Sequence, residues 1–487
     1  MILLVVDNPR RWRLSIPGVE VVAARSYLLA GGAGRARGTL VFNLCRSYGY
    51  QRIGYYVSLL AEARGQRCKP SIETIQEMRS KAVVRVASSD LSAQIQRALS
   101  RLRTAEFVLS VYFGRSLAKR HQPLATALFN QFQAPLLRAR FQRRRGAWEL
   151  AGIGPIPAGE IPETHHEFVV EAAQAYFARR RWSPPRSRSP RCTLAILHDP
   201  QEKLAPSDPK ALRRFVRVGR RLGIASELIT RQDYSRVAEF DALFIRTTTF
   251  VHHYTYRFAS RAKAGGLVVI DDPRSIVRCT NKVFLAEMLE RSDIPAPRTM
   301  LVHRDNVESV QAELGLPCVL KEPDGSFSTG VTRATNEAEL REGLERLLAQ
   351  SELVVAQEFL PTDYDWRVGV LDGRALYACR YFMSRGHWQV INHGASGPSA
   401  SGRVETLAVE DVPRKVIDTA LAASRLMGDG LYGVDLKEVG GRVLVIEVNE
   451  NPNIEVGYED RVLKDELYER ILRFFLERVE ARRAATS

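Results

Sequence analysis

The chain has 487 residues with 71 Lys and Arg against 55 Asp and Glu, a formal net charge of +16. At roughly 100–200 residues per domain, this length predicts about two to four domains. With 45% hydrophobic and 26% charged residues, the composition is that of a globular protein. No apolar run reaches the roughly 20 residues that a membrane span needs. The six cysteines are scattered without a CxxC pair, which argues against a disulfide framework or zinc site and favours a reducing cytoplasm.

The charge is divided unevenly along the chain. Residues 1–192 hold 31 Lys and Arg and 12 Asp and Glu, a net of +19. Residues 193–487 hold 40 and 43 of the same types, a net of −3. This asymmetry predicts an acidic partner for the first part, such as nucleic acid, an anionic membrane or an acidic substrate.

The first 180 residues combine strand and helix signals. Apolar runs predict buried strands, and amphipathic spacing predicts helices. The expected strands are residues 2–7, 19–24, 39–45 and 107–114, and the expected helices are 55–65 and 167–180. We therefore expect an α/β domain over residues 1–180.

An Arg-, Ser- and Pro-rich stretch at 181–191 predicts a linker, because no packed core can form from that composition. Beyond it, residues 192–296 alternate strands with helices, which predicts a small domain with a parallel sheet. From 297 to 487, strands follow one another across short turns, which predicts an α+β domain with antiparallel sheet. The predicted fold class is thus α/β followed by α+β.

The stretch CVLKEPDGSFSTGV (318–331) places Lys321 on a buried strand ahead of a Gly- and Ser-rich turn. Glycines and small hydroxyls let backbone N–H groups approach a polyphosphate, and a strand lysine adds a fixed positive charge. Alone, this pattern is also that of an ordinary hairpin. The turn residues concerned are Gly325, Ser326, Ser328 and Gly330.

A second strand ends in the stretch VVAQEFLPTDYDW (354–366). A carboxylate and free backbone groups at a strand end suit the edge of a purine, and a following aspartate suits ribose hydroxyls. A solvated strand end is the alternative interpretation. The candidate residues are Gln357, Glu358, Phe359, Leu360 and Asp365.

An acidic cluster lies near the C-terminal end. Glu447 and Asn449 are two residues apart on one strand, so both point to one face. Asp435 lies on the preceding strand, which a Gly440-Gly441 turn joins to it as a hairpin. Two carboxylates and an amide oxygen suit magnesium that also contacts phosphates, and carboxylates buried without a cation would be costly. A solvated strand face is the alternative interpretation.

Four further polar residues could neutralise phosphate charge during a transfer step. Each taken singly is also typical of a surface or loop position. They are Lys282 at a helix start, Arg367 in DWRV, Arg380 in ACRYF, and Asn392 in a glycine-rich stretch.

In this order, the pieces resemble the ATP-grasp superfamily and, within it, RimK-type carboxylate–amine ligases, which are glutathione-synthetase-like. The resemblance covers about residues 193–480 and rests on NKVFLAEMLERSDIPAPRTM, VLKEPDGSFSTGV, QEFL, DWRVGV and GVDLKEVGGRVLVIEVNENPN. The opening stretch is similar to the N-terminal domain attached to one subgroup of RimK-like proteins.

The resemblance implies roles for the candidate residues. Lys282 and Lys321 match phosphate-contacting lysines, and residues 325–330 match a loop that closes over the phosphates. Glu358 and Phe359 match an adenine-contacting hinge. Further matches are Asp365 on the ribose side, Asp435, Glu447 and Asn449 as magnesium ligands, Arg367 and Arg380 near the transferred phosphate and acyl group, and Asn392 over the triphosphate. Where ribosomal-protein ligases carry an arginine two residues before this asparagine, the chain has Val390.

The resemblance implies an ATP- and Mg-dependent ligase that joins a carboxylate to an amine through an acyl phosphate. Two Mg ions are expected, with Mn as a possible substitute, and the substrate is expected to be an amino acid or peptide. One alternative is an amino-acid ligase acting on a protein tail. Another is a nucleic-acid- or ribosome-binding protein with a regulatory ATP-grasp module. We expect a cytoplasmic homo-oligomer without membrane contact, whose N-terminal domain has an acidic protein or RNA partner.

Three weaker signals lie outside this constellation. The pairs His165-His166 and His252-His253 are adjacent residues whose side chains point apart, so a shared metal ion is not expected. The second pair follows Arg246 and Thr247–Thr249 at a strand end, where an acceptor pocket is one interpretation. Asn43, Arg46, Tyr48 and Tyr50 form either a polar site or a structural loop.

Overall fold

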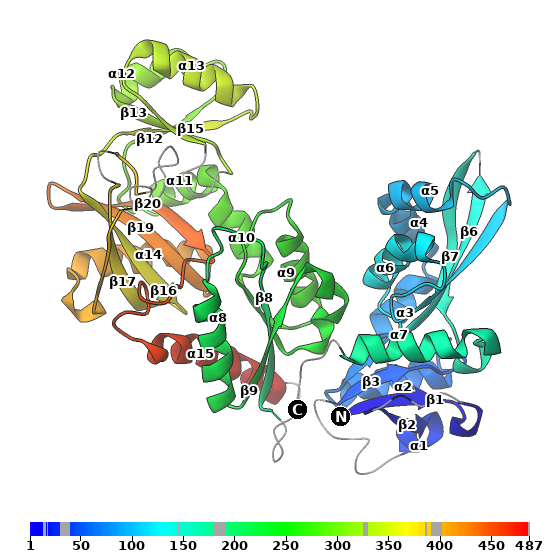
Figure 1. Cartoon of the computed structure of the whole chain (residues 1–487). Coiled ribbons are helices and arrows are strands. Elements are labelled where there is room, and N and C mark those ends of the chain that lie inside the picture. Colours follow the sequence, from blue (N-terminus) through cyan, green and yellow to red (C-terminus); the bar gives the residue numbers. More distant parts are fainter. Residues whose placement is uncertain are drawn as a thin grey trace. The chain divides into compact units, whose positions relative to one another are not determined.

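The computed structural model divides the chain into two compact units, each of which is treated by itself (Figure 1). Unit 1 comprises Met1–Pro184 with Tyr234–Glu239, and unit 2 comprises Pro185–Asp233 with Phe240–Ser487. The structure describes residues 1–12, 16, 18–29, 39–144, 146–178, 190–324, 330–384, 387–390 and 402–485. The expected linker at 181–191 therefore lies almost wholly outside the described residues.

A parallel sheet of order β2-β1-β3-β4 forms one layer of unit 1. Apolar residues are buried on both of its faces, as expected for continuous apolar runs. The elements are β1 (Ile2–Val6), β2 (Glu20–Ala23), β3 (Leu40–Asn43), β4 (Arg67–Lys69), α1 (Ala24–Leu29) and α2 (Ile53–Ala63).

An antiparallel sheet of order β5-β6-β7 forms the other layer of unit 1. Its middle strand alternates buried Ala139 and Phe141 with the arginines Arg138 and Arg140, a period-two pattern that sequence analysis missed among so many basic residues. The strands are β5 (Glu106–Tyr112), β6 (Leu136–Arg144) and β7 (Ala147–Pro155). The helices are α3 (Ile72–Arg79), α4 (Lys81–Asp90), α5 (Ser92–Leu99), α6 (Gln122–Gln131) and α7 (His166–Ala178).

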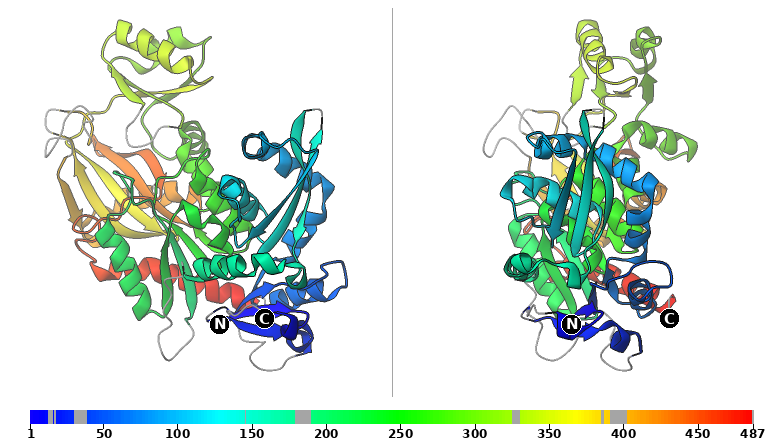
Figure 2. Two further views of the ribbon diagram at one scale, coloured as in Figure 1. Left: turned by 45° about the vertical axis from the view of Figure 1, so that its right-hand side comes forward. Right: turned by 90° about the vertical axis from the view of Figure 1, so that its right-hand side faces the viewer.

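Unit 2 begins with a parallel sheet of order β11-β10-β8-β9. Two helices cover one of its faces through aromatic contacts: the Phe215 ring centroid lies 5.1 Å from that of Phe244 and 4.7 Å from that of Tyr468 (Figure 2). The strands are β8 (Cys192–Leu197), β9 (Ile224–Ile229), β10 (Ala242–Ile245) and β11 (Val268–Ile270). The helices are α8 (Pro209–Arg221), α9 (Tyr254–Ala264), α10 (Pro273–Thr280) and α15 (Asp465–Ala485).

Two antiparallel sheets complete unit 2. The smaller has the order β12-β15-β13-β14, and the larger has the order β18-β17-β16-β19-β20. The smaller contains β12 (Thr299–Val302), β13 (Cys318–Lys321), β14 (Val331–Ala334) and β15 (Val354–Glu358), with helices α12 (Val310–Leu314) and α13 (Glu337–Leu348). The larger contains β16 (Tyr364–Leu371), β17 (Arg374–Phe382), β18 (Val404–Leu407), β19 (Leu431–Val439) and β20 (Arg442–Glu450), with α11 (Lys282–Arg291) and α14 (Arg414–Met427).

These sheets confirm the predicted fold class, α/β followed by α+β. The finer boundaries at 192 and 296 stay predictions, since residues of both segments belong to unit 2. Among the described residues, none of the helices combines the length and apolar character required to cross a bilayer.

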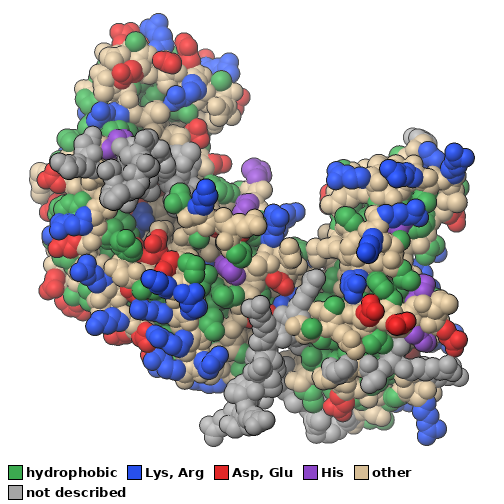
Figure 3. Space-filling view, in the orientation of Figure 1, with side chains coloured by type: hydrophobic (Ala, Val, Ile, Leu, Met, Phe, Trp, Pro, Cys, Tyr) green, Lys and Arg blue, Asp and Glu red, His purple; other side chains and the backbone are tan. Residues whose placement is uncertain are grey.

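Basic side chains are not confined to the first 192 residues. Figure 3 shows Lys and Arg gathered over α4, α5 and the β6–β7 hairpin of unit 1, and again over α8 of unit 2. On α8, Arg217 and Arg221 are both paired with Asp465, at 2.6 Å and 3.0 Å. Part of the basic surface of unit 2 is therefore balanced by its own acids.

Candidate active site

A β-bulge brings the acidic residues of the larger sheet together. The β19–β20 hairpin closes at Gly440 and Gly441, whose φ values of 56° and 73° suit a two-residue turn. A regular ladder from that turn would place Asp435 opposite Ile446. A register shift between Asp435 and Leu436 instead pairs Asp435 with Glu447, so both carboxylates share one face, which Asn449 also shares.

Asp435 is held by a two-point ion pair. Arg367 donates from Nε to Asp435 Oδ1 and from Nη2 to Oδ2, each at 2.6 Å, and Asn449 donates to Oδ2 at 3.0 Å. Burial raises the pKa of Asp435, although the charge of Arg367 and its hydrogen bonds act to lower it. Arg367 thus supplies the positive charge that this carboxylate needs in the protein alone.

Two lysines approach the same face. Asn281 caps α11 by accepting from Phe284 N at 3.0 Å, which places Lys282 in the first turn with its Nζ 3.2 Å from Glu447 Oε1. Lys321 Nζ donates to Gln357 Oε1 at 2.7 Å. Burial and the nearby Lys282 charge lower the pKa of Lys321 to about 8.

These lysines set the ionisation of the acid between them. Burial acts to raise the pKa of Glu447, but the charges of Lys282 and Lys321 outweigh it, and the pKa falls below its ordinary value. Glu447 is therefore a carboxylate at neutral pH, as a cation ligand must be.

The set Asp435, Glu447 and Asn449 fits a hard divalent cation. Two carboxylates face each other across the hairpin, and an amide whose oxygen and nitrogen are interchangeable by a flip lies beside them. In the described part of the chain, no group of three His, Cys, Asp or Glu could hold a metal ion. Phosphate and water oxygens would have to complete the coordination, as is usual for magnesium.

A cavity of about 760 Å³ opens beside the hinge. Phe359 and Trp388 form its aromatic wall, with ring centroids 5.8 Å apart, and the guanidinium of Arg333 lies 5.1 Å from the Phe359 ring. Sequence analysis missed Arg333 and Trp388, because a single arginine and a single tryptophan carry no pattern. A second cavity, of about 460 Å³, lies between α12 and α13 and contains none of the candidate residues.

The structure gives several hinge residues partners within the protein. The carboxylate of Glu358 accepts from Arg298 N at 2.8 Å and from Arg298 Nε at 3.0 Å, so it is turned towards β12. Gln357 binds Lys321 and donates to Thr299 Oγ1 at 2.9 Å. Any contact of Glu358 with a purine would therefore involve its backbone, and Leu360 is half-buried beside it.

Of the glycine-rich turn, only Gly330 lies within the described residues. Its φ of 72° favours glycine, and a Cβ there would lie 2.5 Å from the Glu322 carboxyl carbon, so a larger residue would also require that side chain to move. Gly325, Ser326, Ser328 and Asn392 lie outside the described residues. Val390 is described, and its carbonyl accepts from Gly402 N at 3.0 Å.

The structure places Arg380 on the face of the sheet that is opposite to the acidic residues, and its role near the transferred group stays a prediction. A tight turn pairs Leu371 with Arg374, and a regular ladder would then place Arg380 opposite Asp365, on the acidic face. A bulge between Gly369 and Val370 pairs Arg380 with Trp366 instead, on the opposite face. Its guanidinium lies 4.7 Å from the Trp366 ring and packs against the core.

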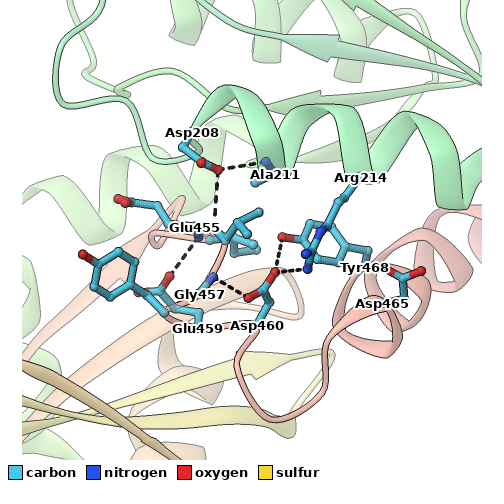
Figure 4. A network of polar contacts seen from close by, with 12 residues as sticks. Asp208, Ala211, Arg214, Glu455, Gly457, Glu459, Asp460, Asp465 and Tyr468 are labelled. Atoms are coloured by element: carbon cyan, nitrogen blue, oxygen red, sulfur yellow. Dashed lines mark hydrogen bonds and ion pairs between the residues drawn. The ribbon is translucent and has the colours of Figure 1, made fainter.

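The loop that follows β20 is bound to helices α8 and α15 (Figure 4). Asp460 accepts from Gly457 N at 2.7 Å, from Arg214 Nη1 at 2.6 Å and from Tyr468 OH at 2.8 Å. Glu459 accepts from Tyr381, whose ring lies against the guanidinium of Arg367 at 5.1 Å. Tyr381 thus connects this loop to Arg367.

The edge of the parallel sheet contributes further polar groups. Arg246 is fully buried and structural, since its donors reach Ser207, Asn451 and two prolyl carbonyls, of Pro206 and Pro452. Thr247 donates to Glu202 at 2.6 Å, and Thr249 donates to Glu450 at 2.7 Å. An acceptor pocket at Thr247–Thr249 stays a prediction.

Of the four polar residues around this strand end, Asn43 and Tyr48 are buried, whereas Arg46 and Tyr50 are exposed. Asn43 is fully buried, and its amide donates to Gly54 O at 2.6 Å and to Ser58 Oγ at 2.9 Å. Tyr48 OH donates to Asn43 O at 2.6 Å. Asn43 and Tyr48 are therefore satisfied within the protein, and a polar site at Arg46 and Tyr50 stays a prediction.

The fold, and the sheet face on which acidic residues lie beside lysine and arginine, define an ATP-grasp protein. Residues 279–474 match the family model described as the RimK-like ATP-grasp domain, and residues 24–172 match the RimK-like ATPgrasp N-terminal domain. The chain therefore contains a RimK-like ATP-grasp domain and the N-terminal domain of RimK-like ATP-grasp proteins. These matches confirm the family and the enzyme class expected from the sequence, an ATP-dependent ligase.

The chain is also similar to curated proteins and to a solved structure. A "Probable alpha-L-glutamate ligase" of Vibrio vulnificus is 26% identical over 231 residues, covering 47% of this chain and 73% of the relative. A protein of Teredinibacter turnerae with the same name is 25% identical, and the match covers 50% of this chain and 78% of the relative. The crystal structure of a "RimK domain protein ATP-grasp" from Sphaerobacter thermophilus has a TM-score of 0.44 at 17% identity. The match covers 58% of this chain and 99% of that protein.

Proposed function

We propose that the protein uses ATP and magnesium to join a carboxylate to an amine, with an acyl phosphate as intermediate. The main support is one face of the larger sheet, which carries Asp435, Glu447 and Asn449. On this face Arg367 contacts Asp435, and Lys282 contacts Glu447. Acids and amides that suit a divalent cation stand beside cations that suit a polyphosphate. This combination fits an ATP-grasp domain better than a site for nucleophilic catalysis.

The proposed reaction has two steps. A substrate carboxylate oxygen attacks the γ-phosphorus of ATP, the bond to the bridging oxygen of ADP breaks, and an acyl phosphate forms. The amine then attacks the acyl carbon, loses a proton, and releases phosphate, so that the products are an amide, ADP and phosphate. Activation is needed because a carboxylate and an amine do not condense in water.

The residues of the face have distinct proposed tasks. Asp435, Glu447 and Asn449 would hold magnesium, with two ions and substitution by Mn²⁺ as part of the proposal. When bound, the metal supplies neutralisation of charge on the phosphate oxygens. Lys282 and Lys321 contact the phosphates, and Arg367 stabilises the oxyanion that forms when the amine attacks.

We propose an amino acid or a peptide as the substrate class. Support comes from the curated relatives, which are named alpha-L-glutamate ligases. Addition of an amino acid to a protein tail is the first alternative within the same chemistry. The net charge of +19 in residues 1–192 favours an acidic partner, protein or RNA, for unit 1.

The experiment is a screen for ADP release from ATP and Mg²⁺ with pooled amino acids and small carboxylic acids. We expect release that requires both a carboxylate and an amine, and its loss in Glu447→Ala. Glu410→Ala, in an exposed residue of the same unit, is the matched control and should behave like the wild type. Near-wild-type release by Glu447→Ala would contradict the assignment of the acidic face.

A further inference from the structure

Lys437 is a third lysine near the acidic residues of the larger sheet, and the sequence motifs assign it no role. It lies on β19 two residues after Asp435. β16 pairs with β19 so that Trp366 is opposite Leu436. One step further along the two strands, Asp365 and Lys437 face each other, and both side chains leave the sheet on the face of Asp435.

The ammonium of Lys437 is bound at the hinge end of this face. Its Nζ donates to Asp365 Oδ1 at 2.5 Å and to Thr362 Oγ1 at 2.6 Å. Thr362 in turn donates to the same carboxylate oxygen at 3.1 Å. The side chains of Lys437 and Asp365 are only 14% and 20% exposed, so water screens this pair less than a surface pair.

The contacts of Lys437 differ from those of the other cations on the face. Lys282 contacts Glu447, and Arg367 contacts Asp435, so both lie at the predicted metal end. The cations that lower the pKa of Glu447 are Lys282, Lys321 and Arg367. Lys437 instead contacts Thr362 and Asp365, which follow the hinge directly in the chain. The hydrogen bonds of Lys437 therefore lie at the hinge end of the face, although its charge also acts on Lys321.

We propose that Lys437 is a positioning residue that lets Asp365 recognise the ribose hydroxyls of ATP. The proposal rests on the ATP site of the proposed function and deepens it. Lys437 and Thr362 occupy Oδ1 of Asp365, which leaves Oδ2 to accept a hydroxyl. A carboxylate locked in one orientation binds a donor without the loss of side-chain freedom that a mobile carboxylate would suffer. Selection of ribonucleotides over nucleotides without these hydroxyls therefore depends on Lys437.

A competing role for Lys437 is direct contact with a phosphate, and the two roles predict different nucleotide preferences. If Lys437 acts through Asp365, its loss weakens the binding only of nucleotides that carry the hydroxyls. If Lys437 contacts a phosphate, its loss weakens the binding of every nucleoside triphosphate equally. Comparison of ATP with 2′,3′-dideoxy-ATP, which keeps the base and the triphosphate, separates them.

The test is calorimetric binding of ATP and 2′,3′-dideoxy-ATP to the full chain with Mg²⁺ and without a carboxylate substrate. We expect the wild type to prefer ATP about tenfold, the size of one hydrogen bond to a charged group. Lys437→Met and Asp365→Asn should each reduce that preference to about twofold, and the double variant should reduce it no further. Lys415→Met, in an exposed lysine of α14, is the matched control.

Equal weakening of both nucleotides in Lys437→Met would overturn the proposal in favour of a phosphate contact. Unchanged preference in Lys437→Met would also overturn it. Absence of ATP binding by the wild type would instead contradict the proposed function itself, so the two failures are distinguishable. Lys437→Arg keeps the charge and should retain most of the preference, which excludes a general loss of folding.

Discussion

Arg367 and Asp435 face each other on neighbouring strands and form two hydrogen bonds of 2.6 Å each. The pair joins the cation proposed for oxyanion stabilisation to an acid proposed as a magnesium ligand. Arg367 therefore stands where it neutralises Asp435 in the protein alone, and a bound cation would share that task.

Removal of Arg367 should show that Arg367 and a bound cation both neutralise Asp435. Loss of one partner of a buried pair typically costs about 3 kcal/mol, so Arg367→Met should lower the free energy of unfolding by that order. Mg²⁺ should restore part of it, since a cation that binds only the folded state stabilises it. Thermal unfolding with and without Mg²⁺ should show a larger Mg-dependent gain for the variant than for the wild type.

The matched control for this prediction is Arg380→Met. Arg380 lies on the opposite face of the same sheet, packed on Trp366, so its loss should change stability without changing the response to Mg²⁺. An equal Mg²⁺ response of Arg367→Met and the wild type would contradict the shared-charge account.

The affinity for ATP should depend on the charge of Lys321. The pKa of this lysine is lowered to about 8, so it is charged below that pH and neutral above it. Binding of ATP should weaken as the pH rises through about 8, by up to about tenfold one pH unit higher. Calorimetry near pH 7 and near pH 9 measures the change.

Lys321→Arg is the control for the pH dependence. An arginine stays charged throughout this range, so its ATP affinity should be nearly constant across the same interval. The same slope in the wild type and in Lys321→Arg would assign the dependence to another group.

Glu450 should make the protein less stable as the pH rises. Burial raises its pKa from 4.5 to about 7, so between these values the folded state keeps a proton that the unfolded state loses. The free energy of unfolding therefore falls as the pH rises through this window. Glu450→Gln keeps an acceptor for Thr249 and should raise stability above pH 7 by about 1–3 kcal/mol.

Thermal unfolding from pH 5 to pH 8 checks this prediction, with Glu410→Gln at an exposed position as control. Parallel pH profiles for Glu450→Gln and the wild type would show that Glu450 does not titrate in this interval.

Sequence reasoning grouped the candidate acidic residues because several of their features are local. Alternation along one strand placed Glu447 and Asn449 on one face, and the glycine pair predicted the hairpin with Asp435. The cap at Asn281 likewise fixed the position of Lys282. These features depend on neighbours in the chain, so they could be predicted from it.

What the sequence could not show depends on bulges and on distant contacts. One bulge moved Arg380 to the opposite face, and another brought Asp435 opposite Glu447. Neither bulge has a sequence signature, although each changes which residues share a face. Lys437 was missed because its partner Asp365 lies 72 positions away in the chain.

The basic first part of the chain makes its own prediction. If its partner is nucleic acid, binding of RNA to the full chain should weaken steeply as salt increases. If its partner is an acidic protein, polyglutamate should bind more tightly than RNA. Fluorescence anisotropy at several salt concentrations measures both, and a lack of binding to either polymer would show that the charge of residues 1–192 is solvated surface.

The central claim is that ATP activates a carboxylate as an acyl phosphate. The most direct test uses a carboxylic acid labelled with oxygen-18, chosen from the substrates that support ADP release. The account predicts that each amide formed transfers one labelled oxygen to the released phosphate, as detected by mass spectrometry. Amide formation with unlabelled phosphate would contradict it.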